Sequence, residues 1–310
     1  MNKQGNKEME MITRPCPLCG STNDSNVFAE ADFDAERLDD FAFSSRKVPE
    51  YMHYRLISCP VCDLLYANPI PILDILVKAY QEADFDSSEE AYYASRTYSR
   101  FLPKIMKKLP DLVGAIDIGT GDGAFLEQLL ARGFTNAVGV EPSKAPIAAA
   151  KDEIRSLIRH SFFQPQDFEN DNFSLVTCFQ TLEHLYDPME MCRNAYKMLK
   201  KDGAAFFICH NRYSLSTKLL GMRSPIFDIE HLQLFSPKSV KYLLEQNGFA
   251  DVEVKVIYNC YPLHYWLRLF PLPRKLKLVW MSVLKKTGIG YIPISIPAGN
   301  MAVIGYKRVL

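Results

Sequence analysis

Residues 113–123 read Val-Gly-Ala-Ile-Asp-Ile-Gly-Thr-Gly-Asp-Gly, an apolar run that ends in closely spaced glycines. We expect a buried strand over Val113–Ile118, then a tight glycine turn, then a helix whose apolar residues include Phe125 and Leu129. Glycines in such a turn let the backbone approach a bound molecule closely. Several nucleotide-binding folds share this pattern, so the surrounding sequence has to distinguish between them.

The segments that follow alternate between strands and helices. This alternation predicts an α/β fold with a doubly wound, mostly parallel Rossmann-like sheet that carries helices on both faces. Ligands of such sheets bind beyond the carboxyl ends of the strands, where Asp117, Glu141, Gln180 and His210 fall. The further strands are expected at Ala137–Val140, Leu175–Phe179, Ala204–Cys209, Val252–Tyr258 and Met301–Tyr306, and helices at Pro146–Leu157 and Asp187–Leu199.

Asp117 indicates what kind of molecule the glycine turn binds. Gly119, Gly121 and Ala124 also satisfy the dinucleotide fingerprint, and Glu141 would accept hydrogen bonds from a ribose in either case. A carboxylate at the mouth of the turn would repel a diphosphate, whereas it attracts an ammonium group. S-adenosylmethionine offers an ammonium group, a sulfonium and a ribose but no phosphate. The turn therefore favours a cationic cofactor such as this one over NAD, and it disfavours an NAD-dependent oxidoreductase.

Several motifs carry a family resemblance. Ala115–Gly123 resembles the first motif of class I S-adenosylmethionine-dependent methyltransferases, and Glu141-Pro-Ser143 resembles their second, acidic motif. This resemblance implies a Rossmann-like sheet whose last strand is antiparallel. Later segments are similar to further motifs of the same family: Thr181–Pro188, Leu199–Gly203, His231–Val240, Asn247–Phe249 and Gly299–Lys307.

The resemblance also implies which residues bind the cofactor. The loop of the first motif would hold the methionine end, the second motif would hold the ribose, and Gln180 would lie beside the methionine. Asp167 and Phe168 would flank the adenine. The complete expected set is Asp117, Gly119, Thr120, Gly121, Glu141, Pro142, Asp167, Phe168 and Gln180.

Histidines are the candidates for catalysis, because an acceptor that carries a proton needs a base that titrates near neutral pH. His184 and His231 are the expected catalytic residues, in that order, and His210 also falls near the strand ends. Ordinary surface or core positions remain an alternative for each of them. A divalent ion held by Glu183, His184 and His231 is a further alternative.

Two cysteine pairs near the N-terminus predict a metal site. Cys16-Pro-Leu-Cys19 and Cys59-Pro-Val-Cys62 each place two thiolates within reach of one tetrahedral Zn²⁺, and together they complete its coordination shell. Four thiolates leave no open position, so this zinc would be structural; redox-active pairs are the alternative. The pairs resemble those of a methyltransferase subset with an N-terminal zinc-binding module, found in sugar and surface-glycan pathways. The acceptor implied is a small or glycan-related molecule, including nucleotide-sugars and lipid-linked sugars.

Charge and length limit the remaining possibilities. In the 310 residues, 36 basic side chains balance 36 acidic ones, which disfavours nucleic acid as a partner and an RNA methyltransferase as the alternative function. The polar start, without an apolar stretch, predicts a cytoplasmic location. We expect a zinc-binding module over 1–70, a helical linker that covers the cofactor over 71–110, and the methyltransferase domain over 111–310, with an insert at about 259–298.

The insert is strongly basic. From Val254 to Leu310 the chain has no Asp or Glu but nine Lys and Arg residues, and both tryptophans, Trp266 and Trp280, lie there. Bases beside Trp, Leu and Phe over 261–286 suit a helix at an anionic membrane surface. A lid or a dimer contact that buries the same aromatics is the alternative. Both interpretations stay open, as does the oligomeric state.

Overall fold

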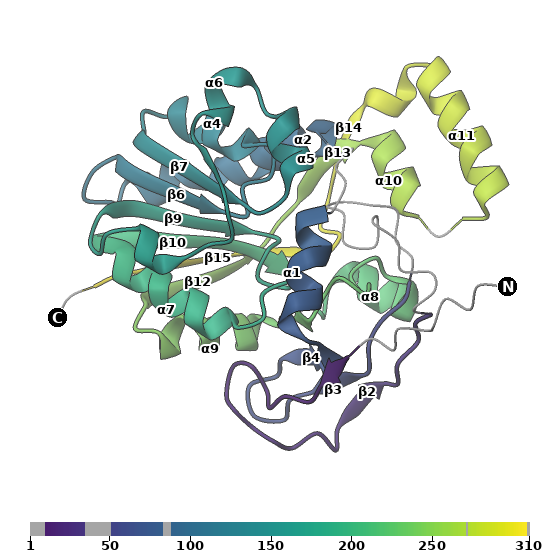
Figure 1. The fold of residues 1–310 in the computed structure, drawn as a ribbon. Coiled ribbons are helices and arrows are strands. Elements are labelled where there is room, and N and C mark those ends of the chain that lie inside the picture. The colour runs from purple at the N-terminus through teal and green to yellow at the C-terminus, as the bar shows by residue number, and fades with distance from the viewer. Residues whose placement is uncertain (1–9, 35–50, 83–87, 271, 309–310) are drawn as a thin grey trace, which may run out of the picture.

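The computed structural model describes residues 10–34, 51–82, 88–270 and 272–308, and Figure 1 shows their arrangement. A seven-stranded sheet lies at the centre, in the order β12-β15-β10-β9-β6-β7-β8. β15 is antiparallel to both of its neighbours, and the other neighbouring strands are parallel. The expected α/β Rossmann-like fold with an antiparallel last strand is therefore confirmed. The strands are β6 (Val113–Ile118), β7 (Thr135–Glu141), β8 (Ile158–His160), β9 (Phe173–Phe179), β10 (Leu199–His210), β12 (Ala250–Val256) and β15 (Asn300–Tyr306).

Helices cover both faces of this sheet because apolar side chains of successive residues point to opposite faces. Phe206 packs into the core on the side of α2, α3 and α4, whereas Phe207 packs on the side of α7 and α9. The helices of the first side are α2 (Ser88–Tyr98), α3 (Leu102–Met106), α4 (Ala124–Leu130), α5 (Lys144–Ala149) and α6 (Asp152–Arg155), and those of the second are α7 (Pro188–Met198) and α9 (Pro237–Gln246).

Two of the sequence motifs turn out to be helix starts. The Asp187 side chain accepts a hydrogen bond from the Glu190 backbone N–H and caps α7, with Pro188 as its first residue. Ser236 caps α9 in a reciprocal arrangement with Ser239. Both patterns satisfy N–H groups that a helix leaves without partners, and proline at the first position loses no hydrogen bond.

One expected helix is broken. In place of a continuous helix over Pro146–Leu157, α5 and α6 are separated by Ala150 and Lys151, which are extended. The Arg155 guanidinium donates to backbone carbonyls at the end of α5, which compensates for the helical bonds lost at the break. The short edge strand β8 was not predicted, since its three residues, Ile-Arg-His, form no apolar run that could be recognised.

The N-terminal part is joined to the central sheet through a second sheet. Its order is β11-β4-β3-β2, and β11 (Gln233–Leu234) comes from the chain between β10 and α9. The other strands here are β1 (Met11–Ile12), β2 (Val27–Ala29), β3 (Leu56–Ser58), β4 (Leu65–Ala67) and β5 (Ile70–Pro71). The domain boundary at residue 70 stays a prediction. The four-stranded sheet is not confined to residues before it, because β11 lies far beyond this position in the chain. Much of the loop between the two cysteine pairs, residues 35–50, lies outside the described residues.

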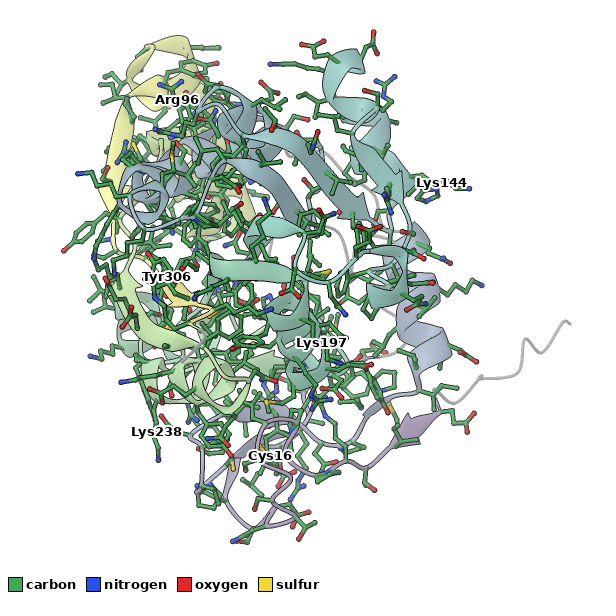
Figure 2. All side chains as sticks on the ribbon, turned by 90° about the vertical axis from the view of Figure 1, so that its left-hand side faces the viewer. Cys16, Arg96, Lys144, Lys197, Lys238 and Tyr306 are labelled. Carbon is green, nitrogen blue, oxygen red and sulfur yellow. The ribbon has the colours of Figure 1, made fainter. Side chains whose placement is uncertain are left out.

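Side-chain hydrogen bonds reinforce the junction between the N-terminal part and the rest of the chain. The Arg14 guanidinium donates to the carbonyl oxygens of Ala67 and Leu232 and to Oε1 of Gln233. Lys238 of α9 donates to the carbonyl of Val61, between the second pair of cysteines. Figure 2 shows Cys16 and Lys238 at the same end of the molecule, with side chains filling the space between the sheets and helices.

Further elements surround the central sheet. α1 (Leu73–Glu82) lies between the central sheet and the N-terminal sheet (Figure 1), and η2 (Ser99–Phe101) continues α2. The insert forms a hairpin that frames two helices. The elements of the insert are β13 (Asn259–Pro262), α10 (Leu263–Leu269), α11 (Arg274–Lys286), η5 (Ile289–Tyr291) and β14 (Pro293–Ile296). Three short helices lie elsewhere in the chain: η3 (Pro165–Asp167), α8 (Leu215–Leu220) and η4 (Gly221–Arg223). Within the described ranges, no helix combines the length and apolar character needed to span a bilayer.

Candidate functional site

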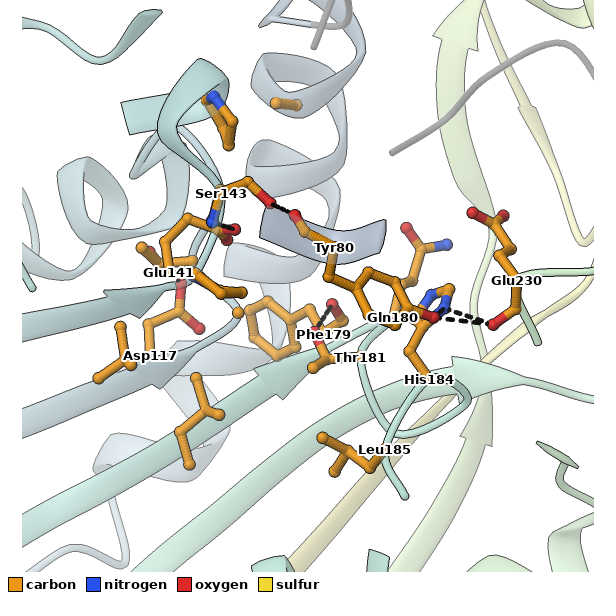
Figure 3. A pocket seen from close by; sticks show the side chains of 18 of the residues that line it. Tyr80, Asp117, Glu141, Ser143, Phe179, Gln180, Thr181, His184, Leu185 and Glu230 are labelled. Carbon is orange, nitrogen blue, oxygen red and sulfur yellow. Dashed lines mark hydrogen bonds between the residues drawn. The ribbon is translucent and has the colours of Figure 1, made fainter. Parts of the chain in front are cut away.

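A cavity of about 460 Å³ opens at the carboxyl ends of β6, β7, β9 and β10. Residues of α1, α2 and α10 close it from the other side. Parallel strands end at the same edge of the sheet, so residues that are far apart in the sequence meet there. Figure 3 shows the side chains that line this cavity.

The glycine turn forms the floor of the cavity. Gly119 has a φ of 73°, and a Cβ at this position would lie 2.3 Å from Oγ1 of Thr181, so a side chain has no room. Gly121 also has a positive φ, of 60°, but its missing Cβ would meet nothing within 4 Å. The N–H groups of Gly119 and Thr120 donate to the carbonyl of Val140, which fixes the turn against β7.

Asp117 lies at the end of β6 and is only 2% exposed. Thr177 Oγ1 donates to one carboxylate oxygen (2.6 Å) and Thr120 Oγ1 donates to the other (2.8 Å). Burial raises the pKa of Asp117 to about 6, although the two hydroxyl donors act in the opposite direction. Near neutral pH the Asp117 carboxylate is therefore ionised, and the side chains that donate hydrogen bonds to it are neutral hydroxyls.

Glu141 lies at the end of β7 and is 7% exposed. Its carboxylate accepts hydrogen bonds from the backbone N–H groups of Gly121 and Ser143, both at 2.9 Å. Burial raises the pKa of Glu141 most strongly, and the negative charge of Asp117 raises it further. Two buried carboxylates thus share one cavity, and among the described residues neither forms an ion pair with a basic side chain.

The structure brings together all of the expected cofactor residues except two. Gln180 lines the cavity with a backbone φ of 49°, a conformation that is uncommon for a non-glycine residue. Those that line the cavity are Asp117, Gly119, Thr120, Gly121, Glu141, Pro142 and Gln180.

The exceptions are Asp167 and Phe168, which do not line the cavity. The Phe168 ring packs against Phe163 at a centroid distance of 6.0 Å, and the Arg159 guanidinium lies over the Phe168 ring, 4.6 Å from its centroid. Phe162 and Phe163 line the cavity in their place. The adenine contact expected of Asp167 and Phe168 stays a prediction that the cavity lining does not support. The two phenylalanines that line the cavity in their place follow just after β8, a strand that the sequence did not predict.

Three histidines meet at the opposite end of the cavity. The ring of His231 lies 4.9 Å from that of His184 and 5.0 Å from that of His210. In each ring Nδ1 faces a carbonyl oxygen, which accepts hydrogen bonds only: Glu230 O (3.0 Å) for His184, Ile226 O (2.8 Å) for His231 and Asn300 Oδ1 (2.8 Å) for His210. Nδ1 therefore carries the proton in each neutral ring, and Nε2 is the nitrogen that can accept one.

The histidines differ in basicity and surroundings. Burial is the main reason that the pKa of His210 is lowered to about 4; the hydrogen bond with Asn300 acts against this and the neighbouring His184 adds to it. His210 therefore stays neutral and is a weak base near pH 7. His231 Nε2 lies 3.6 Å from the carboxylate of Glu230. The sequence brought His184 and His231 forward as candidates, and both line the cavity.

The alternative metal site at Glu183 is not formed. Glu183 is fully buried, and its carboxylate accepts a hydrogen bond from the backbone N–H of His210 (2.5 Å). Burial raises the pKa of Glu183 to about 7. In the part of the chain that the structure describes, the four cysteines are the group able to hold a metal ion, and Glu183 with His184 and His231 is not.

A helix at the position of α1 was expected, but the contacts of its residue Tyr80 were not. The Tyr80 hydroxyl lies 3.0 Å from Nδ1 of His184 and donates to the carbonyl of Glu230, and Ser143 Oγ donates to the Tyr80 carbonyl (Figure 3). Tyr80 thus connects the histidines to the loop after β7. No local pattern marks this residue, because its partners lie more than sixty positions away in the sequence.

The cysteines converge as the two-pair pattern requires. The four sulfur atoms lie within 4.8 Å of one another, with Cys16 and Cys62 at 3.5 Å and Cys19 and Cys59 at 3.4 Å. Sulfurs bound to one tetrahedral zinc lie about 3.8 Å apart, so the group fits this ion. The residues after the pairs, Gly20 and Asp63, both have positive φ, as two equivalent tight turns would.

The insert has two different parts. α10 lines the cavity with Tyr265 and Leu269, and Arg268 is paired with Glu90 of α2 at 3.1 Å. α11 does not line the cavity, and its Trp280 is 51% exposed. The first part has the position expected of a lid and the second part does not.

A comparison with known protein families covers the domain that carries this site. A family model described as a methyltransferase domain matches residues 89–254, which is more than half of the chain. Ubiquinone biosynthesis O-methyltransferases from Pseudomonas putida and Coxiella burnetii are each 32% identical to it, over 103 and 102 residues, covering 31% of this chain and 44% and 43% of theirs. The chain thus spans less than half of the length of these curated relatives.

Solved structures show a similar fold. A SAM-dependent methyltransferase from Archaeoglobus fulgidus is 17% identical, with a TM-score of 0.47 over 69% of this chain and 94% of that one. A possible histamine N-methyltransferase from Thermotoga maritima is 18% identical, with a TM-score of 0.46 over 71% of this chain and 91% of that one. With the strand order and the match over 89–254, the conclusion is direct: this chain belongs to the family of methyltransferase domains.

Proposed function

We propose that this protein transfers a methyl group from S-adenosylmethionine to a small or glycan-related acceptor. The observation that carries this proposal is the pair of buried carboxylates, Asp117 and Glu141, that share one cavity without a basic partner among the described residues. Burying two like charges is unfavourable, and a cationic ligand relieves the cost. The same pair opposes NAD, because a diphosphate would add negative charge.

The residues present fit S-adenosylmethionine. Asp117 with the glycine turn would hold its amino-acid end, and Glu141 would accept hydrogen bonds from the ribose hydroxyls. Phe162 and Phe163 offer apolar surface for the base. When bound, the cofactor supplies an activated methyl group, so the chain has to orient the acceptor and take up its proton.

His184 is the residue proposed to take up that proton. Its Nδ1–H points at the Glu230 carbonyl and the Tyr80 oxygen, which holds the ring and directs Nε2 to accept the proton. His231 is the second candidate and His210 is too weak a base. A base of this kind suits a hydroxyl or an acidic carbon as the acceptor.

The acceptor is proposed from two resemblances. The relatives named ubiquinone biosynthesis O-methyltransferases indicate a small molecule that is methylated on oxygen. The cysteine pairs resemble those of enzymes that act in sugar and glycan pathways. Screening quinols, nucleotide-sugars and lipid-linked sugars for uptake of a labelled methyl group tests the acceptor class.

We also propose that the cysteine group binds one structural Zn²⁺. Four thiolates complete the coordination of the ion and leave no position for a substrate. Zn²⁺ binds the thiolate form, so the four thiols would lose their protons on binding. Zinc content of the purified protein is the direct measurement.

Calorimetry tests the cofactor. The protein is expected to bind S-adenosylmethionine and not NAD, and Asp117→Asn is expected to weaken the former about 30-fold or more, as removal of one partner of a buried charge pair does. Asp111→Asn is the matched control, because Asp111 precedes β6 at the opposite edge of the sheet and pairs with Lys200. Tight binding of NAD, or equal effects of the two variants, would refute the proposal.

A further inference from the structure

We propose that α11 docks this protein onto the surface of an anionic lipid bilayer. α11 (Arg274–Lys286) projects from the body of the molecule in Figure 1, and its packing neighbours are α10 and η5. It does not line the cavity, so its role is separate from methyl transfer.

One face of α11 is apolar and exposed. Leu276, Val279, Trp280 and Val283 are 45%, 60%, 51% and 43% exposed. Their spacing of three, four and seven positions places them in one stripe along the helix. The half-buried positions Met281 and Leu284 lie on another side, so the helix packs on the protein without using this stripe.

Bases border the stripe. By helical periodicity Lys275 and Lys286 lie along one border of the stripe, and Lys285 lies on the opposite face of the helix; all three are exposed. Within the described ranges none of the three forms an ion pair. A helix with an apolar stripe, flanking lysines and a half-exposed tryptophan has the properties of one that lies in a membrane interface.

The other bases of this region are already used. Lys255 pairs with Glu253, Arg268 with Glu90 and Lys307 with Asp171. Since Val254–Leu310 contains no acidic residue, the unneutralised charge of this region gathers on α11. Anionic headgroups are the complementary surface, and each base near such a surface strengthens binding about fivefold.

The turn after α11 adds to the apolar surface. Ile289, Tyr291 and Ile292 are 49%, 51% and 53% exposed, and η5 packs against α11. Aromatic and branched residues beside lysines match the boundary between headgroups and acyl chains.

A second copy of this chain fits the surface less well. In a two-fold dimer the same patch faces itself, so the lysines of both copies would approach one another. The region holds no carboxylate to separate them. Charge therefore favours the bilayer over self-association.

Vesicle binding tests the inference on the full chain. Co-sedimentation is expected with vesicles that contain 30% phosphatidylglycerol at low salt, and it should be lost with pure phosphatidylcholine or at high salt. A Trp266→Phe variant leaves Trp280 as the reporter, and its emission should shift to the blue on binding. Trp266 is the partly buried tryptophan whose N–H donates to Ile294 O, so its replacement does not touch the stripe.

Matched charge variants give the residue-level test. Replacing Lys275, Lys285 and Lys286 by Gln is expected to weaken vesicle binding about 100-fold. Replacing the exposed lysines Lys107, Lys144 and Lys201 by Gln removes the same charge elsewhere and is expected to have little effect. Circular dichroism and binding of S-adenosylmethionine should stay unchanged in both.

Three outcomes would overturn the inference: no binding to anionic vesicles at low salt, equal losses in the two triple variants, or a blue shift of Trp280 without vesicles together with a concentration-dependent dimer mass. The last outcome would assign the stripe to a second copy. Calorimetry with S-adenosylmethionine is independent of these results, so failure of the docking and failure of the proposed function are distinguishable.

Discussion

Asp117 shows how a single side chain combines local sequence with distant partners. Its position at the end of β6 follows from the apolar run before it, and one of its hydroxyl donors, Thr120, lies in the same turn. The other donor, Thr177, comes from β9, the neighbouring strand in the sheet, and lies sixty positions later in the chain. The charge at this site could be predicted from the motif, but its burial and raised pKa could not, because both depend on neighbouring strands.

Binding of S-adenosylmethionine is predicted to depend on pH. Burial raises the pKa of Asp117 in the free protein to about 6, and a bound cation favours the ionised form. As the pH falls through 6 the carboxyl becomes neutral, and affinity should decrease by up to about tenfold per pH unit. Calorimetry between pH 5 and pH 8 measures this decrease.

The raised pKa of Asp117 has the opposite effect on the pH dependence of folding stability. Because the folded-state pKa is above the usual value, Asp117 contributes stability at low pH, and this contribution is lost as the pH rises through about 6. Asp117→Asn should abolish the pH dependence that Asp117 causes in the affinity for the cofactor and in the free energy of unfolding. Constant affinity of the unmodified protein from pH 8 to pH 5 would contradict the role of Asp117.

His184→Gln is predicted to lower kcat by about 10²- to 10⁴-fold, the usual contribution of a general base. The Kd of S-adenosylmethionine should change less than twofold, because His184 lies at the other end of the cavity from Asp117 (Figure 3). Single-turnover kinetics and calorimetry measure the two quantities. His160→Gln is the control, as His160 is an exposed histidine outside the cavity lining; a normal kcat in His184→Gln would exclude it as the base.

At the scale of elements, α1 is held across the cavity by hydrogen bonds of the Tyr80 hydroxyl and of the Tyr80 backbone carbonyl. Its hydroxyl reaches Glu230 and His184, while its carbonyl accepts from Ser143. Burial raises the pKa of the Tyr80 hydroxyl well above its ordinary value, so it stays a donor. The helix was expected from its position before the sheet, but its contacts depend on loops that only the folded chain brings together.

Tyr80→Phe is predicted to loosen α1. Removing the hydroxyl loses a hydrogen bond of about 1 kcal/mol, so amides of residues 73–82 should exchange about fivefold faster. The ring contact with His184 at 5.6 Å is retained, which limits other changes. Hydrogen exchange measured by mass spectrometry tests this, with Tyr92→Phe on the exposed side of α2 as control; unchanged exchange in α1 would show that the hydroxyl does not hold the helix.

At the scale of the whole molecule, the cysteine group belongs to the main core. Cys16, Cys59 and Cys62 are buried in the same apolar cluster as Phe207 of β10 and Leu243 of α9. Together with the pairing of β11 and β4, this shared core packs the N-terminal part against the domain of the central sheet.

Loss of the proposed zinc is therefore predicted to destabilise the entire protein. Cys59→Ser should abolish zinc binding and lower Tm by about 10 °C, since structural zinc contributes many kcal/mol to folding. Scanning calorimetry with zinc analysis measures both effects. Cys260→Ser changes a half-buried cysteine outside the group and should leave both unaltered; a protein that contains no zinc, or an unchanged Tm in Cys59→Ser, would disprove the structural role.

Local patterns were sufficient for the alternating elements, the glycine turn and the two cysteine pairs, because each depends on backbone conformation and side chains a few residues apart. Folding in three dimensions was needed for the register of Phe162 and Phe163, the break between α5 and α6, the pairing of β11 with β4 and the meeting of three histidines with Tyr80. These features depend on contacts between residues far apart in the chain, and the free energy of such contacts exists only after the sheet has assembled.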